Sequence, residues 1–196
     1  MVKWLGYFFL ISGISLVALF FIRFILSEQA QKSALDEAEA KIQTYQGKII
    51  KGTNSKAEEF HPKDYEAFAT LEIPKLNKTL PVVEGADEKA LDKGIGHLSQ
   101  SVFPGKGEQI VLSGHRDTVF REFNKIEIGD LFTVHMPYGS FKYKIRNTEI
   151  VNEDDTTVIR KMGEEVLVVT TCYPFHYIGN APKRFIAYAY PVDKVK

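Results

Sequence analysis

An uncharged stretch of eighteen residues, 5–22 (LGYFFLISGISLVALFFI), constrains this chain more than any other feature. As an α-helix rising about 1.5 Å per residue, it would span about 27 Å, close to the hydrocarbon thickness of a bilayer. Trp4 and Tyr7 suit one membrane interface, and Arg23 could extend its charge to the other. The shorter apolar run and small-residue cleavage site of a secretory signal peptide are not evident. We therefore predict that residues 1–26 form an uncleaved transmembrane anchor.

The charges that flank this stretch do not fix its orientation. The amino terminus and Lys3 lie on one side, while Arg23 and Lys32 lie on the other. The orientation therefore has to be inferred from where the rest of the chain would find its substrate.

Residues 27–63 are polar and are expected to form a stalk. Residues 27–47 are rich in Ala, Glu, Gln and Lys, which predicts a polar helix ending near Gly47 with few apolar anchors. Residues 51–64 (KGTNSKAEEFHPKD) are typical of a flexible connector.

From residue 64 to residue 196 the pattern changes to short β-like runs separated by turn residues, which indicates an all-β domain. Strands are predicted at 69–74, 79–84, 108–114, 131–136, 141–151, 165–172 and 184–192, and a short helix is predicted at 88–93. Many short, closely spaced strands favour a barrel or a sandwich, in which closure hides the strand edges.

Charge and cysteine content exclude several function classes. Lys plus Arg equals Asp plus Glu at 25 each, so the net charge is zero and gives no indication of the basic surface that nucleic-acid binding requires. The single cysteine, Cys172, permits neither an internal disulfide nor a multi-cysteine zinc site. A lone cysteine is either a small buried hydrophobic residue or a nucleophile, and its neighbours must decide.

Cys172 lies at the mouth of a predicted central strand. Residues 166–169 are apolar at every position, which is typical of a strand covered on both faces. Polarity changes at Thr170, and Pro174 cannot donate to a sheet, so the strand should end there. The next predicted strand begins at Arg184, which would place a guanidinium beside the thiol if the two strands pair.

A thiol nucleophile needs a partner for proton transfer, usually histidine. The candidates are His61, His97, His115, His135 and His176. We favour His115, because it follows an apolar strand-like run and a glycine, and because Asp117 could orient its ring. His176, only four residues after Cys172, remains a competitor.

At these residues the sequence resembles the sortase family. The motifs that carry the resemblance are GHLSQSVFPGKG (96–107), LSGHRDTVFREFNKIEIGDLF (112–132), LVVTTCYPF (167–175) and APKRFIAYA (181–189). The resemblance spans about residues 70–190, and the CYPF continuation is most similar to class D. Sortases usually carry Thr-Leu-x-Thr before the cysteine, whereas here residues 168–171 are Val-Val-Thr-Thr.

The resemblance implies a closed eight-stranded sortase-type β-barrel with short helices, preceded by the transmembrane helix, on the outer face of a Gram-positive-type cell membrane. It implies that Cys172 attacks the threonine carbonyl of an LPxTG-like or LPxTA-like sorting signal on a surface protein. An amine of the peptidoglycan precursor would then resolve the thioester, with His115 as general acid and base and Arg184 stabilising the oxyanion or positioning the peptide. No metal and no cofactor are expected. Predicted substrate-binding residues are His97, Ser113, Asp117, Thr171, Tyr173 and Pro174.

Three other interpretations remain open at this point. A thiol hydrolase would use water to resolve the thioester, and a tethered binding module would carry an inert cysteine. A pilus-polymerising sortase would usually carry an Asp-Pro-aromatic lid motif and often a second membrane segment, neither of which appears in this sequence.

Overall fold

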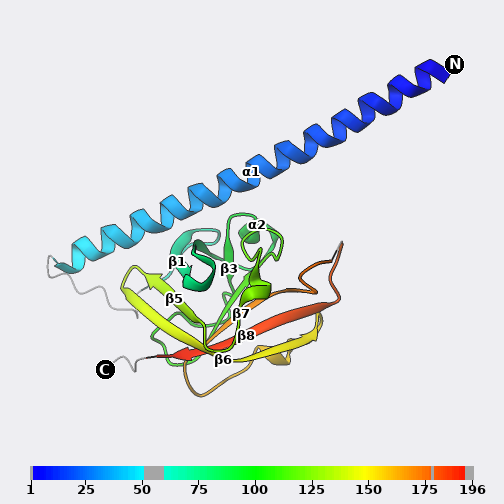
Figure 1. Ribbon diagram of the computed structural model, residues 1–196. Helices are drawn as coiled ribbons and strands as arrows, with labels where there is room; N and C mark the ends of the chain where they lie inside the picture. The colour runs from blue at the N-terminus through cyan, green and yellow to red at the C-terminus, as the bar shows by residue number, and fades with distance from the viewer. Residues whose placement is uncertain (1, 51–59, 178, 193–196) are drawn as a thin grey trace.

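A computed structural model describes residues 2–50, 60–177 and 179–192. Helix α1 (Val2–Ile50) runs past one side of a closed barrel of eight strands, and its amino-terminal half projects beyond the barrel (Figure 1). The predicted fold class, a closed eight-stranded β-barrel preceded by an apolar helix long enough to span a membrane, is confirmed.

The strands are short, except for β6. They are β1 (Ala67–Ile73), β2 (Lys78–Glu84), β3 (Ile95–His97), β4 (Gln109–Gly114), β5 (Leu131–Met136), β6 (Gly139–Asn152), β7 (Val166–Tyr173) and β8 (Lys183–Pro191). The helical elements between them are η2 (Pro74–Leu76), α2 (Glu88–Leu91), η3 (Phe123–Lys125) and η4 (Thr156–Val158).

Around the barrel the strands follow the order β1-β2-β3-β4-β7-β8-β6-β5, and β5 pairs with β1 to close the ring. The pairs β2/β3 and β4/β7 are parallel, and the others are antiparallel. Closure pairs both edges of the sheet, so neither is left as a template for aggregation.

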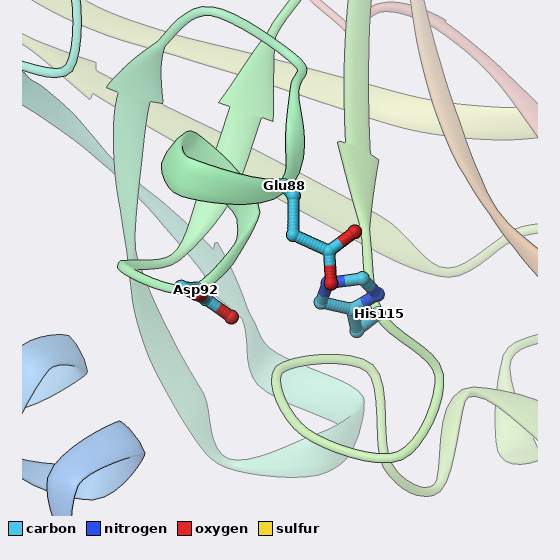
Figure 2. A group of neighbouring side chains, drawn as sticks. All are labelled: Glu88, Asp92 and His115. Atoms are coloured by element: carbon cyan, nitrogen blue, oxygen red, sulfur yellow. The ribbon is translucent and has the colours of Figure 1, made fainter.

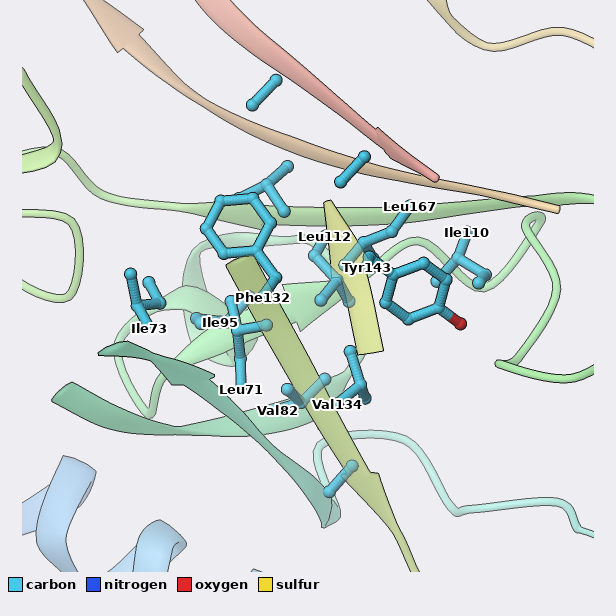
Figure 3. Close-up of a cluster of buried hydrophobic side chains, with 14 of the residues drawn as sticks. Leu71, Ile73, Val82, Ile95, Ile110, Leu112, Phe132, Val134, Tyr143 and Leu167 are labelled. Carbon is cyan, nitrogen blue, oxygen red and sulfur yellow. The ribbon is translucent and has the colours of Figure 1, made fainter. Parts of the chain in front are cut away.

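Strand β7 is apolar on both faces because both faces are covered. Leu167 and Val169 pack in the barrel interior with residues such as Phe132 (Figure 3), whereas Val166 and Val168 pack in a second cluster outside it. All four of these β7 side chains are completely buried. The uniform run in the sequence therefore marks a central strand, as predicted.

Strand β3 is absent from the predicted strands, because the sequence Gly-Ile-Gly at residues 94–96 is typical of a turn. Its glycines permit close backbone packing rather than a change of chain direction. A Cβ at Gly94 would lie 2.6 Å from the carbonyl oxygen of Pro81, and one at Gly96 would lie 2.5 Å from that of Gly85. A three-residue strand containing such a glycine shows no alternation that a sequence pattern could reveal.

The polar helix that was predicted to end near Gly47, as the first part of the stalk, is the carboxyl-terminal part of α1, which continues to Ile50 and packs on the barrel. Ala34 and Ala38 are buried in a cluster of small side chains shared with the barrel residues Ala67, Val83 and Ala90. Most of the predicted connector, residues 51–59, lies outside the described residues.

The predicted start of the catalytic domain at residue 64 omits a core side chain. Phe60 is only 7% exposed and packs against the rings of Phe68, Phe103 and Tyr138. The hydrophobic core therefore includes residue 60, while the domain boundary itself remains a prediction.

Candidate active site

Three neighbouring strands bring the predicted catalytic residues to one end of the barrel. In the parallel pair β4/β7, Gly114 lies opposite Thr171, and His115 and Cys172 follow them directly. In the antiparallel pair β7/β8, Cys172 lies opposite Arg184. The order across the sheet is therefore His115, Cys172, Arg184, with the thiol in the middle.

The backbone at His115 is held by a tight loop. The Phe120 N–H donates to the carbonyl of His115 at 3.0 Å, and this folds the loop back over the end of β4. A Cβ on Gly114 would lie 2.6 Å from the Phe120 ring and 2.7 Å from Val119, so a glycine is needed where the loop folds back over the end of β4. The glycine before His115 thus permits the loop to turn beside the neighbouring strand.

Two carboxylates that the sequence analysis missed lie beside the His115 ring. Glu88 and Asp92 are four residues apart at the two ends of α2, and one donor atom from each lies within 4.8 Å of a ring nitrogen of His115 and of the other (Figure 2). Carboxylate and imidazole groups are ligands for divalent cations such as Zn²⁺. Both carboxylates are exposed, however, and exposed acidic groups often gather without an ion. The cluster alone therefore does not indicate a metal centre.

The Arg184 guanidinium is hydrogen-bonded within its own neighbourhood. Nη1 donates to the carbonyls of Ala181 and Lys183, each at 3.0 Å, and Nη2 lies 3.4 Å from a carboxylate oxygen of Glu153. The side chain is one-third exposed. Exposed ion pairs of this kind are weak, so the contact with Glu153 contributes little to holding the guanidinium in this position.

Arg116, also missed by the sequence analysis, connects the loop after β4 (residues 115–122, the histidine loop) to the loop after β7 (residues 174–177 and 179–182, the cysteine loop). Its guanidinium donates to the carbonyls of Pro174, Tyr177 and Gly179 at 3.0, 2.6 and 3.0 Å, and it lies 5.7 Å from the centre of the Tyr177 ring. Three carbonyl partners more than fifty residues away leave no mark in the sequence. Its only indication was its position directly after His115.

Thr171 was predicted to bind substrate, but the structure gives it another position. Its side chain is 2% exposed, and its hydroxyl donates to the carbonyl of Gly114 at 2.7 Å. Because Gly114 and Thr171 precede His115 and Cys172, this bond fixes the spacing of the two strand ends. Thr171 therefore has a structural role in aligning the two strands, and its contact with substrate remains a prediction.

His97 was also predicted to bind substrate, and burial argues against that role. The ring is 1% exposed, stacks on Phe103 at 4.5 Å, and places Nδ1 2.8 Å from Oε2 of Glu84. Burial alone would raise the pKa of Glu84, but hydrogen bonds from His97 and Ser99 outweigh it and lower the pKa. The pair is therefore a buried polar contact of the core.

The other four predicted substrate-binding residues lie around the end of the barrel that carries Cys172. Ser113 is partly buried near the end of β4, and Asp117 is exposed in the histidine loop. Tyr173 packs edge-on against Phe175 at 5.3 Å, and the Pro174 carbonyl accepts from Arg116. Their contact with substrate remains a prediction.

His176, the competing histidine, lies on the cysteine loop and lines a cavity of about 220 Å³. Arg116, Asp117 and Phe175 line the same cavity. This position beside the loops agrees with a role in contacting a ligand, whereas His115 occupies the strand end next to Cys172.

The family model of the sortase domain matches residues 71–192, more than half of the chain. The chain belongs to the sortase family. It is 46% identical over 157 residues to Sortase D of Bacillus subtilis (strain 168), a match that covers 76% of this chain and 79% of that protein.

Solved sortases share the fold. The catalytic domain of B. anthracis SrtD is 38% identical with a TM-score of 0.59, and the match covers 72% of this chain and 97% of that one. A Clostridium perfringens Sortase D5 transpeptidase has a TM-score of 0.68 and is 21% identical, with 84% of this chain and 99% of that chain covered.

Family membership excludes one of the open interpretations. Sortases are cysteine transpeptidases, so this sortase is an enzyme, most similar to class D, and the inert-cysteine binding module is excluded. Sortases act at the cell surface on proteins that carry sorting signals and on cell-wall precursors, and the apolar part of α1 is consistent with a membrane anchor.

Proposed function

We propose that this sortase cleaves an LPxT(G/A)-type sorting signal after the threonine and transfers the acyl group to an amine of a peptidoglycan precursor. The observation that carries the proposal is the row of His115, Cys172 and Arg184 at the ends of β4, β7 and β8. A nucleophile, a group that transfers protons and a cation thereby converge at one end of a rigid barrel.

In the first half of the reaction the Cys172 sulfur attacks the threonine carbonyl carbon. His115 takes the proton from the Cys172 thiol and passes it to the leaving amine as the bond from that carbon to the following residue's nitrogen breaks. A thioester between Cys172 and the substrate threonine remains. Arg184 stabilises the negative charge that develops on the carbonyl oxygen, or it holds the peptide.

In the second half an amine attacks the thioester carbonyl. His115 takes a proton from the attacking amine and passes it to the departing Cys172 sulfur, a new amide forms, and the Cys172 thiol is regenerated. Because one amide is exchanged for another through the thioester, the step requires no nucleoside triphosphate.

We also propose that the barrel lies outside the cell, anchored by residues 1–26. Two observations support this placement: the uncharged run near the amino terminus and the cell-surface action of the family. Protease added to intact protoplasts should degrade the barrel, and full protection would contradict the orientation.

Mass spectrometry of the purified protein with a small library of LPxT-containing peptides tests the substrate. An acyl adduct on Cys172 from LPxTG or LPxTA peptides, absent with scrambled sequences, is the expected result. The same reaction with and without an added amine separates transfer from hydrolysis: a transpeptidase forms an amide product with the amine, whereas a hydrolase releases the free acid at the same rate in both.

A further inference from the structure

One cavity in this sortase lies between helix α1 and the barrel rather than inside the barrel. Its volume is about 470 Å³. One wall comes from α1 and includes Phe20, Arg23 and Phe24, and the other comes from the start of β2 and the histidine loop. It is separate from the smaller cavity that His176 lines.

The α1 wall of this cavity lies where the apolar run of the helix ends. The uncharged stretch finishes at residue 22, Arg23 follows it, and polar residues predominate from Ser27 onward. A helix placed across a bilayer by residues 5–22 would hold Arg23 at the depth of the lipid headgroups. The cavity therefore opens at the membrane surface.

The cavity carries three cationic side chains from three separate segments: Arg23 of α1, Lys78 of β2 and Arg121 of the histidine loop. The Lys78 ammonium donates to the carbonyl of Arg121 at 2.9 Å, so two of the cations share one wall. Partial burial lowers the pKa of Lys78; the carboxylate of Glu122 opposes this shift, whereas the neighbouring cations Arg121 and Lys125 add to it. An anion placed there would offset this repulsion.

Two carboxylates also line the cavity, Glu28 and Asp117, and they leave a net charge of one positive unit. The Asp117 carbonyl accepts hydrogen bonds from Nε and Nη2 of Arg121, at 3.1 and 2.9 Å, and these bonds hold the guanidinium in the loop. Thr118 also lines the cavity, and its hydroxyl is buried without a hydrogen-bond partner within the described residues. It could donate to an oxygen of an incoming ligand.

We propose that this cavity binds the phosphate of an anionic phospholipid from the bilayer that holds α1. The cations and the Thr118 hydroxyl provide the phosphate site, and Phe20 and Phe24 provide the apolar side for the acyl chains. Phe20 lies within the apolar run and Phe24 follows Phe20 by one helical turn, so acyl chains can contact both rings, whereas a free phosphate would use neither. The bound lipid would hold the loop that begins at His115 against the membrane surface.

Native mass spectrometry of the full-length protein in detergent tests the proposal. Dioleoyl phosphatidylglycerol should be retained as a one-to-one complex, whereas dioleoyl phosphatidylcholine should not, and millimolar inorganic phosphate should not displace the bound lipid. The double variant Lys78→Gln/Arg121→Gln should weaken retention about tenfold. The matched control, Lys142→Gln/Lys144→Gln, removes two exposed cations from β6 and should bind like the wild type.

Arg23→Gln provides a second variant, because a change on α1 outside the barrel leaves the barrel core untouched. It should also weaken retention. Equal retention of both lipids, displacement by inorganic phosphate, or unchanged binding by Arg23→Gln and the double variant would each overturn the proposal. Preferential capture of a diphosphate-bearing precursor lipid over phosphatidylglycerol would also overturn it, by assigning the cavity to a different lipid.

Discussion

Cys172 and Arg184 are direct partners across the antiparallel pair β7/β8, so their side chains leave the same face of the sheet one strand apart. The Arg184 guanidinium nevertheless bonds to Glu153 and to two nearby carbonyls. The backbone thus places the cation beside the thiol, while its present hydrogen bonds hold the end of the loop before β8. A catalytic role and a structural role for Arg184 are therefore both available, and they predict different outcomes.

Arg184→Ala should lower kcat/KM by about 10²–10³-fold, the usual cost of removing one donor to an oxyanion. The control is Glu153→Gln, which removes the charge that Arg184 contacts and leaves the guanidinium in place. Because the pair is exposed, this variant should stay within about twofold of the wild type. If Glu153→Gln costs as much as Arg184→Ala, Arg184 acts by holding the loop.

Arg116→Lys should raise KM about tenfold with a smaller effect on kcat. Lysine keeps the charge but cannot reach three carbonyls with one planar fork, so the loop after Pro174 should loosen. Peptide kinetics, together with amide hydrogen exchange of the loop, measure the effect. Arg160→Lys, the same change at an arginine that contacts the Thr157 carbonyl, should leave both quantities unchanged. If amide hydrogen exchange in the loop after Pro174 is as slow in Arg116→Lys as in the wild type, Arg116 does not hold that loop in place.

The fold was predictable wherever strands carried their own pattern. The apolar run at residues 166–169 and the following change at Thr170 located β7, and through it Cys172. Strand β3 was not predicted because its glycines, which allow neighbouring backbone to pack closely, look like turn residues in the sequence. The packing of Ala34 and Ala38 on the barrel escaped because alanine adds little hydrophobic periodicity to a polar helix.

The site was predictable only as far as its motifs reached. Cys172, His115 and Arg184 came from strand ends and from the family resemblance, and register now places them side by side. Glu88 and Arg116 were missed because their contacts cross the barrel end between segments distant in sequence. Motifs also could not distinguish an exposed residue from a buried one such as Thr171.

Glu84→Gln should destabilise the barrel at neutral pH by about 1–3 kcal/mol, since it removes a buried charge that pairs with His97. The pKa of Glu84 is lowered in the folded state, so its contribution is complete above the unfolded pKa of about 4.3 and is lost as the pH falls through the lower folded value. The difference between variant and wild type should therefore shrink below about pH 4.

Urea unfolding at pH 7 and at pH 3.5 measures this change. Glu72→Gln is the matched control, because Glu72 pairs with His135 at 3.1 Å on the exposed surface and should contribute less than about 1 kcal/mol. Equal losses for the two variants at pH 7 would contradict the importance of burial.

A truncated protein beginning near Ser55 should fold alone and unfold cooperatively, because the barrel core lies after that point. A shorter one beginning at Asp64 loses Phe60, which packs on Phe68, Phe103 and Tyr138. Removing a buried phenylalanine costs about 3–5 kcal/mol, so the protein that begins at Asp64 should unfold at a clearly lower urea concentration than the one that begins near Ser55. Equal stability would place the domain start at residue 64, as the sequence pattern predicted.

The choice between His115 and His176 tests the assignment of the proton-transfer residue most directly. Cys172→Ala should abolish thioester formation with the fold intact, because alanine fits the partly buried thiol's position at the end of β7. His115→Ala should lower turnover by about 10²–10⁴-fold, the usual contribution of general acid–base catalysis. His176→Ala should change turnover only modestly, through the loop cavity that it lines. If His176→Ala abolishes turnover while His115→Ala stays near the wild type, the strand-end row does not define the catalytic site and the assignment of His115 is wrong.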